Sequence, residues 1–228
     1  MSAIISLTTI PDRIKHIEPC IRSLVAQGLP VYLWAVEKIA RSETRLGKLP
    51  SFLADAGVHV EVVEDCGPIT KLLPALRRGF ETILTADDDR VYGDGWARDL
   101  LAWSNELPDA ALGYRGRLFG KARTYEKSRV IWAPKRPTQV ELITNCRGGL
   151  YRSCFFAASF FEEWRQWPRN DDIVISAHLQ RRGIPIVIIP CHFRTKRTKA
   201  YNIRPLFGQN AHHRRLNDEG LRRMMWHG

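Results

Sequence analysis

The chain has 228 residues, of which 44% are hydrophobic and 26% are charged. This length suits one well-packed domain and is short for two, and this composition excludes a disordered protein. The formal net charge is +11. Such an excess favours partners with negative charge, namely nucleic acid, an anionic membrane surface, or a substrate such as a nucleotide diphosphate. Charge alone does not choose among them.

The five cysteines are widely scattered, and no CxxC pair occurs. This spacing argues against a zinc site and against a disulfide framework, and it favours reduced thiols in a cytoplasmic protein. The apolar stretch at the N-terminus is too short for a signal peptide, and no apolar run is long enough to span a bilayer. We therefore expect a cytoplasmic protein, with at most a peripheral contact at the inner face of an anionic membrane.

The first part of the chain alternates short apolar runs with helical segments. We expect strands over residues 3–8, 31–36, 58–63 and 82–86. We expect a helix that opens after Asp12 and ends at Gly28, with a kink or a late start at Pro19. A polar helix that runs through Leu53 and a helix over residues 69–80 follow. This β-α-β-α-β-α-β order predicts an α/β fold with a mostly parallel central sheet and helices on both faces.

The second part of the chain is less regular. We expect strands over residues 112–115, 130–132, 140–144 and 184–189, and helices over residues 96–103, 155–167, 172–182 and 218–226. There is no internal repeat and no low-complexity linker. The chain is therefore expected to form a single compact domain over residues 1–228.

Three consecutive carboxylates, Asp87, Asp88 and Asp89, directly follow the apolar run 82–86. The carboxyl ends of the strands form the ligand-binding edge of an open α/β sheet. Adjacent carboxylates repel one another, and a bound cation holds them together most readily. Asp87 and Asp89 stand two apart and can share one ion, for which oxygen ligands favour Mg²⁺, Mn²⁺ or Ca²⁺. The alternative is a solvated acidic turn in which Asp94 caps the next helix.

Two further segments carry groups suited to chemistry. A Gly67-Pro68 turn after the third strand leads into a helix, whose N-terminal N–H groups can seat a phosphate, and Lys71 adds a cation there. Asp171 and Asp172 begin a later helix, where one carboxylate could act as a general base if it faces the acid cluster. The alternatives are an ordinary turn with a surface lysine and a helix start in which carboxylates complement the helix dipole.

Together with two other segments they form an ordered set of five along the chain. In chain order, the five segments are 5–13 (ISLTTIPDR), 67–72 (GPITKL), 87–89 (DDD), 148–151 (GGLY) and 171–172 (DD). This ordered set resembles glycosyltransferases of the GT-A fold, in particular compact family 2-like bacterial members and, more distantly, the exostosin-like transferase domain. The resemblance covers most of the chain, from Ile4 to the C-terminal helix. It implies a GT-A type domain with a nucleotide-binding half over residues 1–105 and an acceptor-side half over residues 106–228.

The resemblance implies transfer of a sugar from a nucleotide-sugar donor, for which we expect a UDP-sugar, to a hydroxyl group of a glycan, a lipid-linked acceptor or another acceptor. Asp87 and Asp89 match the pair that holds a manganese or magnesium ion (Mn²⁺ or Mg²⁺) against the pyrophosphate. The positions that match donor contacts are Thr8, Thr9, Arg13, Asp65, Lys71, Asp88, Gly148 and Gly149. Among them, the glycines match a turn close to the donor sugar, where the lack of a Cβ lets the substrate approach.

The resemblance also implies the catalytic groups. Asp172, narrowly ahead of Asp171, matches the carboxylate that deprotonates the acceptor hydroxyl in inverting members. His212 and His213 are candidates for a late histidine in the metal shell, and the alternative for each is a packed or surface histidine.

Two other functions remain open from the sequence. A sugar nucleotidyltransferase usually carries a Gly-rich basic loop after its first strand, and residues 8–11 lack it. A nucleic-acid-binding module is supported by the basic segments 194–199 and 212–215, but no recognisable nucleic-acid-binding motif occurs.

Overall fold

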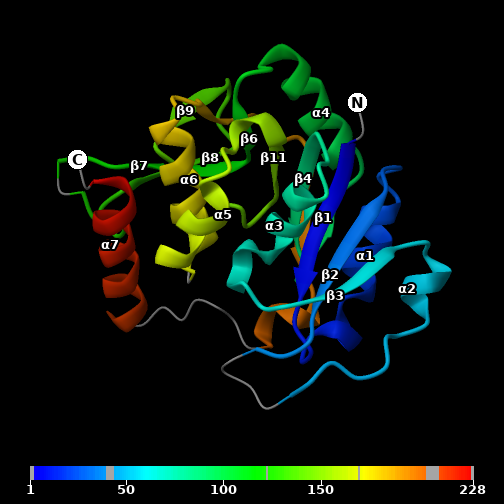
Figure 1. Ribbon diagram of the computed structural model, residues 1–228. Helices are drawn as coiled ribbons and strands as arrows, with labels where there is room; N and C mark the ends of the chain where they lie inside the picture. Colours follow the sequence, from blue (N-terminus) through cyan, green and yellow to red (C-terminus); the bar gives the residue numbers. More distant parts are fainter. Residues whose placement is uncertain (1–2, 40–43, 122, 169, 204–210, 227–228) are drawn as a thin grey trace.

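The computed structural model describes residues 3–39, 44–121, 123–168, 170–203 and 211–226, with only the backbone described for residues 211–214. An eight-stranded sheet in the order β3-β2-β1-β4-β11-β6-β12-β9 forms its centre (Figure 1). The strands are β1 (Ala3–Thr9), β2 (Val31–Val36), β3 (His59–Val63), β4 (Thr82–Asp87), β6 (Ala111–Gly113), β9 (Thr138–Val140), β11 (Gly149–Arg152) and β12 (Ile186–Ile188).

The sheet is mostly parallel, as predicted. Parallel pairings join β3 to β2, β2 to β1, β1 to β4, and β6 to β12. The exceptions are β11, which runs antiparallel to both β4 and β6, and β9, which runs antiparallel to β12. Thr8 of β1 pairs with Asp87 of β4, so the acid cluster lies at the carboxyl end of the central strands.

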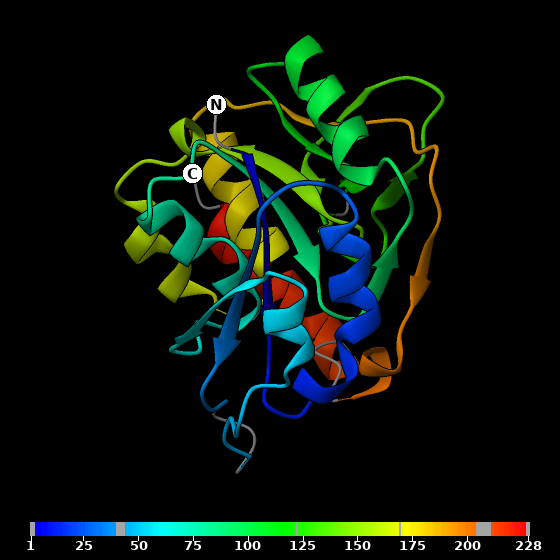
Figure 2. The ribbon, with the colours of Figure 1, turned by 90° about the vertical axis from the view of Figure 1, so that its right-hand side faces the viewer.

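Helices cover both faces of the sheet. Successive strand residues point to opposite faces, so that Ile4 and Ile83 belong to one buried cluster while Ile5 and Leu84 belong to the other. The second cluster contains residues of α1 (Glu18–Val25), α2 (Phe52–Asp55) and α4 (Trp96–Glu106), which face the viewer in Figure 2. The first contains residues of α3 (Leu73–Arg77), α5 (Phe160–Glu163), α6 (Asp171–Arg181) and α7 (Ala211–Met225). Burial on both faces explains why the central strands are nearly continuous apolar runs.

The four strands expected in the first part of the chain are confirmed to within one residue at each end. The helices differ where prolines occur. Pro19 lies in the first turn of α1, which begins only after a short 3₁₀ turn, η1 (Ile14–His16), so the late start is confirmed. Pro74 likewise stands at the start of α3, and the preceding residues form a separate 3₁₀ helix, η2 (Gly67–Lys71). The polar helix expected through Leu53 is reduced to α2, and residues 40–43 lie outside the described part.

The second part departs further from expectation. β11 was not predicted, because a glycine turn was expected at Gly148 and Gly149. The helix expected over residues 155–167 is broken into η3 (Ser153–Phe155), α5 and η4 (Trp164–Gln166). The expected strand over residues 140–144 is divided between β9 and β10 (Leu142–Ile143), and β10 forms a small sheet with β7 (Arg115–Leu118) and β8 (Arg129–Trp132).

A two-stranded sheet supports the turn that carries the acids. β5 (Arg90–Tyr92) begins directly after Asp89 and pairs antiparallel with β13 (Thr195–Arg197). Thr198 N also donates to the carbonyl oxygen of Asp89 at 2.8 Å. The basic segment 194–199 is thus largely built into the structure beside the acid cluster.

All five cysteines are free thiols in the structure. Among the described helices, none has the length and apolar character needed to cross a bilayer.

Candidate active site

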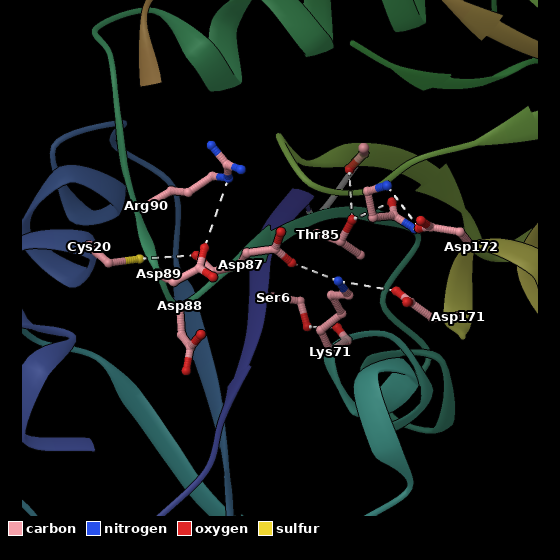
Figure 3. A network of polar contacts seen from close by, with 12 residues as sticks. Ser6, Cys20, Lys71, Thr85, Asp87, Asp88, Asp89, Arg90, Asp171 and Asp172 are labelled. Atoms are coloured by element: carbon pink, nitrogen blue, oxygen red, sulfur yellow. Dashed lines mark hydrogen bonds and ion pairs between the residues drawn. The ribbon is translucent and has the colours of Figure 1, made fainter. Parts of the chain in front are cut away.

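Lys71 joins two carboxylates from distant parts of the chain. Its Nζ lies 2.8 Å from Asp87 Oδ1 at the end of β4 and 3.1 Å from Asp171 Oδ2 at the start of α6 (Figure 3). The Lys71 side chain is only 7% exposed. Burial lowers the pKa of Lys71, but the charges of Asp171 and Asp87 more than offset this and hold it well above its ordinary value. Lys71 is therefore a charged group that ties the acid cluster to α6.

Asp88 points away from its two neighbours (Figure 3). Its carboxylate accepts hydrogen bonds from Thr9 Oγ1 and from Arg13 Nη1, both at 2.7 Å. Arg13 in turn donates from Nε to the carbonyl oxygen of Ile203 at 2.8 Å. Asp88, Thr9 and Arg13 thus hold the loop after β1 against the acid cluster. Their predicted contact with a nucleotide stays a prediction.

Asp89 is the carboxylate with the fewest partners in the cluster. Its Oδ1 is buried without a hydrogen-bond partner, and the nearest cations, Arg90 Nε and Arg13 Nη1, each lie 3.9 Å from one of its oxygens. Burial, together with the charges of Asp87 and Asp88, raises the pKa of Asp89 to about 6. An under-compensated carboxylate of this kind fits a site for a cation.

The carboxylates of Asp87 and Asp89 suit a divalent ion that takes its other ligands from a substrate and from water. Mg²⁺ is commonly held by one or two carboxylates together with substrate phosphates and water. Asp87 and Asp89 fit that arrangement, whereas no group of three or more His, Cys, Asp or Glu side chains among the described residues is placed to hold an ion alone. The side chains of His212 and His213 lie outside the described part of the chain.

Asp172 is held by a residue that the sequence did not single out. Asn145 donates to Asp172 Oδ1 from its backbone N at 2.9 Å and from Nδ2 at 3.1 Å. The hydroxyl of Tyr151 donates to Asn145 Oδ1 at 2.6 Å and so fixes the amide. Burial, followed by the charge of Asp171, raises the pKa of Asp172 to about 7. A positioned carboxylate with a pKa near neutrality is suited to general base catalysis.

The first turn of α6 does not use its carboxylates as caps. Asn170 is the N-cap, and its Oδ1 accepts from Ile173 N at 3.3 Å. Asp171 pairs with Lys71, and Asp172 accepts from Asn145. Asp94 does not cap α4 either, because the N-cap residue of α4 is Gly95, which has a φ of 80°, and no side chain caps the helix.

At Gly148 and Gly149, neighbouring protein atoms explain why the residues are glycines. Gly148 has a φ of +88°, and a Cβ there would lie 2.6 Å from Trp96 Cζ2 and 2.7 Å from the carbonyl oxygen of Thr85. A Cβ on Gly149 would lie 3.0 Å from Asn145 Oδ1. At both positions the missing Cβ makes room for protein atoms. A donor sugar close to these glycines stays a prediction.

The remaining predicted contacts are used within the fold. Thr8 Oγ1 donates to the carbonyl oxygen of Trp34 at 2.9 Å. Asp65 Oδ1 accepts from Gly67 N at 2.8 Å, and Thr70 Oγ1 donates to the carbonyl oxygen of Gly67 at 2.7 Å. The turn before Lys71 is thereby closed by its own side chains, and a phosphate seat at this turn stays a prediction.

No protein-family model matches the chain, and no curated protein sequence matches it. Solved structures do. A crystal structure of S. aureus TarS has a TM-score of 0.52 at 15% identity, over 84% of this chain and 36% of that one. A structure of S. aureus TarS 1-349 in complex with UDP-GlcNAc has a TM-score of 0.50 at 14% identity, over 84% of this chain and 57% of that one. This chain thus spans between about a third and three fifths of those structures, and the likeness shows a shared fold.

Proposed function

We propose that the protein is a glycosyltransferase of the GT-A type, which transfers a sugar from a nucleotide-sugar donor, a UDP-sugar, to an acceptor hydroxyl. The observation that carries the proposal is the pairing of Lys71 with both Asp87 and Asp171. It joins three of the segments on which the resemblance rests, at the carboxyl edge of the sheet, where open α/β folds bind ligands. The fold shared with TarS, which has been crystallised with UDP-GlcNAc, supports the choice of donor.

In this proposal the donor is bound by residues 1–105 and the acceptor by residues 106–228. Asp87 and Asp89 would hold Mn²⁺ or Mg²⁺, which when bound neutralises the charge that develops on the leaving nucleoside diphosphate. Lys71 adds a fixed positive charge at the same place, in a buried setting where electrostatic stabilisation is strong. Asp88 and Arg13 keep the loop after β1 in position at the edge of the site.

Asp172 takes the proton from the acceptor hydroxyl. Asn145 occupies Oδ1 of Asp172, and no described residue donates a hydrogen bond to Oδ2. Asp171 is a poorer candidate, because its carboxylate already pairs with Lys71. We assign Asp171 the role of positioning Lys71 between the two carboxyl groups.

Hydrolysis of the donor by water tests the proposal without knowledge of the acceptor. The protein is incubated with UDP-, GDP- and CMP-sugars and Mn²⁺, and the released nucleotide is measured. We expect hydrolysis of a UDP-sugar that Asp89→Asn abolishes and that Asp94→Asn preserves, since Asp94 is an exposed carboxylate in the next turn. Turnover that survives Asp89→Asn, or no hydrolysis of any donor, would contradict the proposal. If the protein hydrolyses no UDP-sugar but retards DNA in a gel-shift assay in a salt-dependent manner, it is instead a nucleic-acid-binding module.

A further inference from the structure

Two arginines lie near an exposed tryptophan next to the candidate site. Trp132, at the end of β8, is 45% exposed. The guanidinium carbon of Arg147 lies 3.7 Å from the centre of the Trp132 ring, and that of Arg115 lies 5.8 Å from it. Both arginines are half-buried. We refer to Arg115, Trp132 and Arg147 as the arginine–tryptophan cluster.

The two positive charges of this cluster have no carboxylate partner among the described residues. The side chain of Arg115 donates a hydrogen bond to a thiol, from Nη1 to Cys146 Sγ at 3.6 Å. Burial raises the pKa of Cys146, so this thiol stays neutral near neutral pH. The Nε–H groups of Arg115 and Arg147 are both buried without a hydrogen-bond partner. Cations that are partly removed from water are normally paired, so two unpaired ones indicate a site for an anion.

Close contact with the indole also restrains the guanidinium group of Arg147. A guanidinium whose face lies over an aromatic ring keeps its N–H edge available, and this edge matches a phosphate or a carboxylate in a bidentate manner. Burial lowers the pKa of Arg147, and the positive charge of Arg90 lowers it further. Arg90 thus adds a third positive charge near the cluster.

One loop connects this cluster to the proposed base. Within residues 144–148, Asn145 binds Asp172, while Thr144 N donates to the carbonyl oxygen of Arg115 at 2.8 Å. Trp96 Nε1 fixes the same loop by donating to the carbonyl oxygen of Arg147 at 3.1 Å. An anion bound at the cluster is therefore held by the loop that also positions Asp172.

We propose that the acceptor carries a phosphate or a carboxylate, which Arg115 and Arg147 bind beside Trp132, and that this places its hydroxyl near Asp172. The inference rests on the proposed function and adds the chemical class of the acceptor. The diphosphate of the donor is the other source of such an anion. The test therefore keeps the donor site filled.

The test is a calorimetric titration of the full chain, saturated with UDP and Mg²⁺, with glucose, glucose 6-phosphate and glucuronate. We expect at least one of the two charged sugars to bind, and glucose to bind at least about tenfold more weakly. The double variant Arg115→Gln/Arg147→Gln should weaken binding of the charged sugar at least about tenfold and leave the affinity for UDP unchanged. Trp132→Ala, a change at an exposed side chain, should also weaken binding and serves if the double variant does not fold.

A control variant separates the site from net charge. Lys48→Gln/Arg182→Gln removes the same charge at two exposed residues outside the cluster and should leave binding unchanged. Charged sugars that bind the UDP-saturated chain no more tightly than glucose, or that bind equally well to the double variant, would overturn the inference. Failure of UDP to bind contradicts the proposed function instead, so the two failures are distinguishable.

Discussion

The charge on Asp172 is unfavourable for the stability of the fold. The side chain is buried next to the carboxylate of Asp171, and its pKa rises from 3.8 to about 7. Below pH 4 the group is protonated in both the folded and the unfolded chain. Between pH 4 and 7 the unfolded chain releases this proton first, so the contribution of Asp172 to the free energy of unfolding falls as the pH rises.

Asp172→Asn should therefore stabilise the fold at high pH. The amide oxygen can still accept from Asn145, while the buried charge is removed. We expect the gain in unfolding free energy over the wild type to be near zero below pH 4 and to reach about 2–4 kcal/mol above pH 7. Denaturant unfolding in EDTA at several pH values measures it, with Asp94→Asn as the control. A gain that does not depend on pH would show that the burial of this charge is not its cause.

The same substitution should impair the reaction. If Asp172 is the general base, Asp172→Asn lowers the turnover number for donor hydrolysis by about 10²–10⁴-fold and leaves the KM for the donor unchanged. The wild-type rate should rise with pH around a midpoint near 7, where Asp172 ionises. Steady-state kinetics from pH 5 to 9 tests both statements. An unchanged turnover number in Asp172→Asn would remove this residue from the mechanism.

At the residue scale, the sequence identified charged groups better than the groups that hold them. Adjacent acids and a lysine after a glycine turn are visible patterns, and the structure joins Asp87, Lys71 and Asp171. Asn145 lies in a loop between two short strands, and nothing in its neighbourhood marks it as a partner of Asp172. Its role depends on where α6 packs, which no local pattern reveals.

At the scale of elements, the connection from β10 to β11 carries Asn145, which holds Asp172. Gly148 takes a left-handed conformation there, with the ring of Trp96 and the backbone of β4 directly against it. The sequence predicted a turn at these glycines but missed the strand that follows, because four residues beginning with glycine carry little strand signal. Likewise, the aromatic run 155–167 has an apolar character that fits a helix, but its residues pack as short separate turns.

Gly148→Ala should destabilise the fold more than a similar change elsewhere. A Cβ at Gly148 would overlap Trp96 and the Thr85 backbone in addition to the strain of its positive φ, so we expect a loss of about 2–5 kcal/mol. Gly183→Ala is the matched control, since Gly183 has a φ of +67° with no atom within 4 Å of the added Cβ. There we expect only about 1–2 kcal/mol from backbone strain. Equal losses, measured by denaturant unfolding, would contradict the packing argument.

At the scale of the whole molecule, the parallel order of the sheet brings the site together. β1, β3 and β4 run in the same direction, so the segments that follow them meet at one edge. This part of the fold was predictable from the alternation of strands and helices. The half of the sheet that contains β6, β11 and β12 was not, because its pairing order departs from the chain order and includes an antiparallel strand.

The central claim is that Asp87 and Asp89 bind a divalent cation which in turn binds a nucleotide diphosphate. Calorimetric titration with UDP, in Mn²⁺ and in EDTA, tests it most directly on the wild type and on Asp89→Asn. We predict that Mn²⁺ strengthens UDP binding to the wild type at least about tenfold and that Asp89→Asn loses this gain. Equal affinity for UDP with and without the metal, or an undiminished gain in Asp89→Asn, would contradict the account.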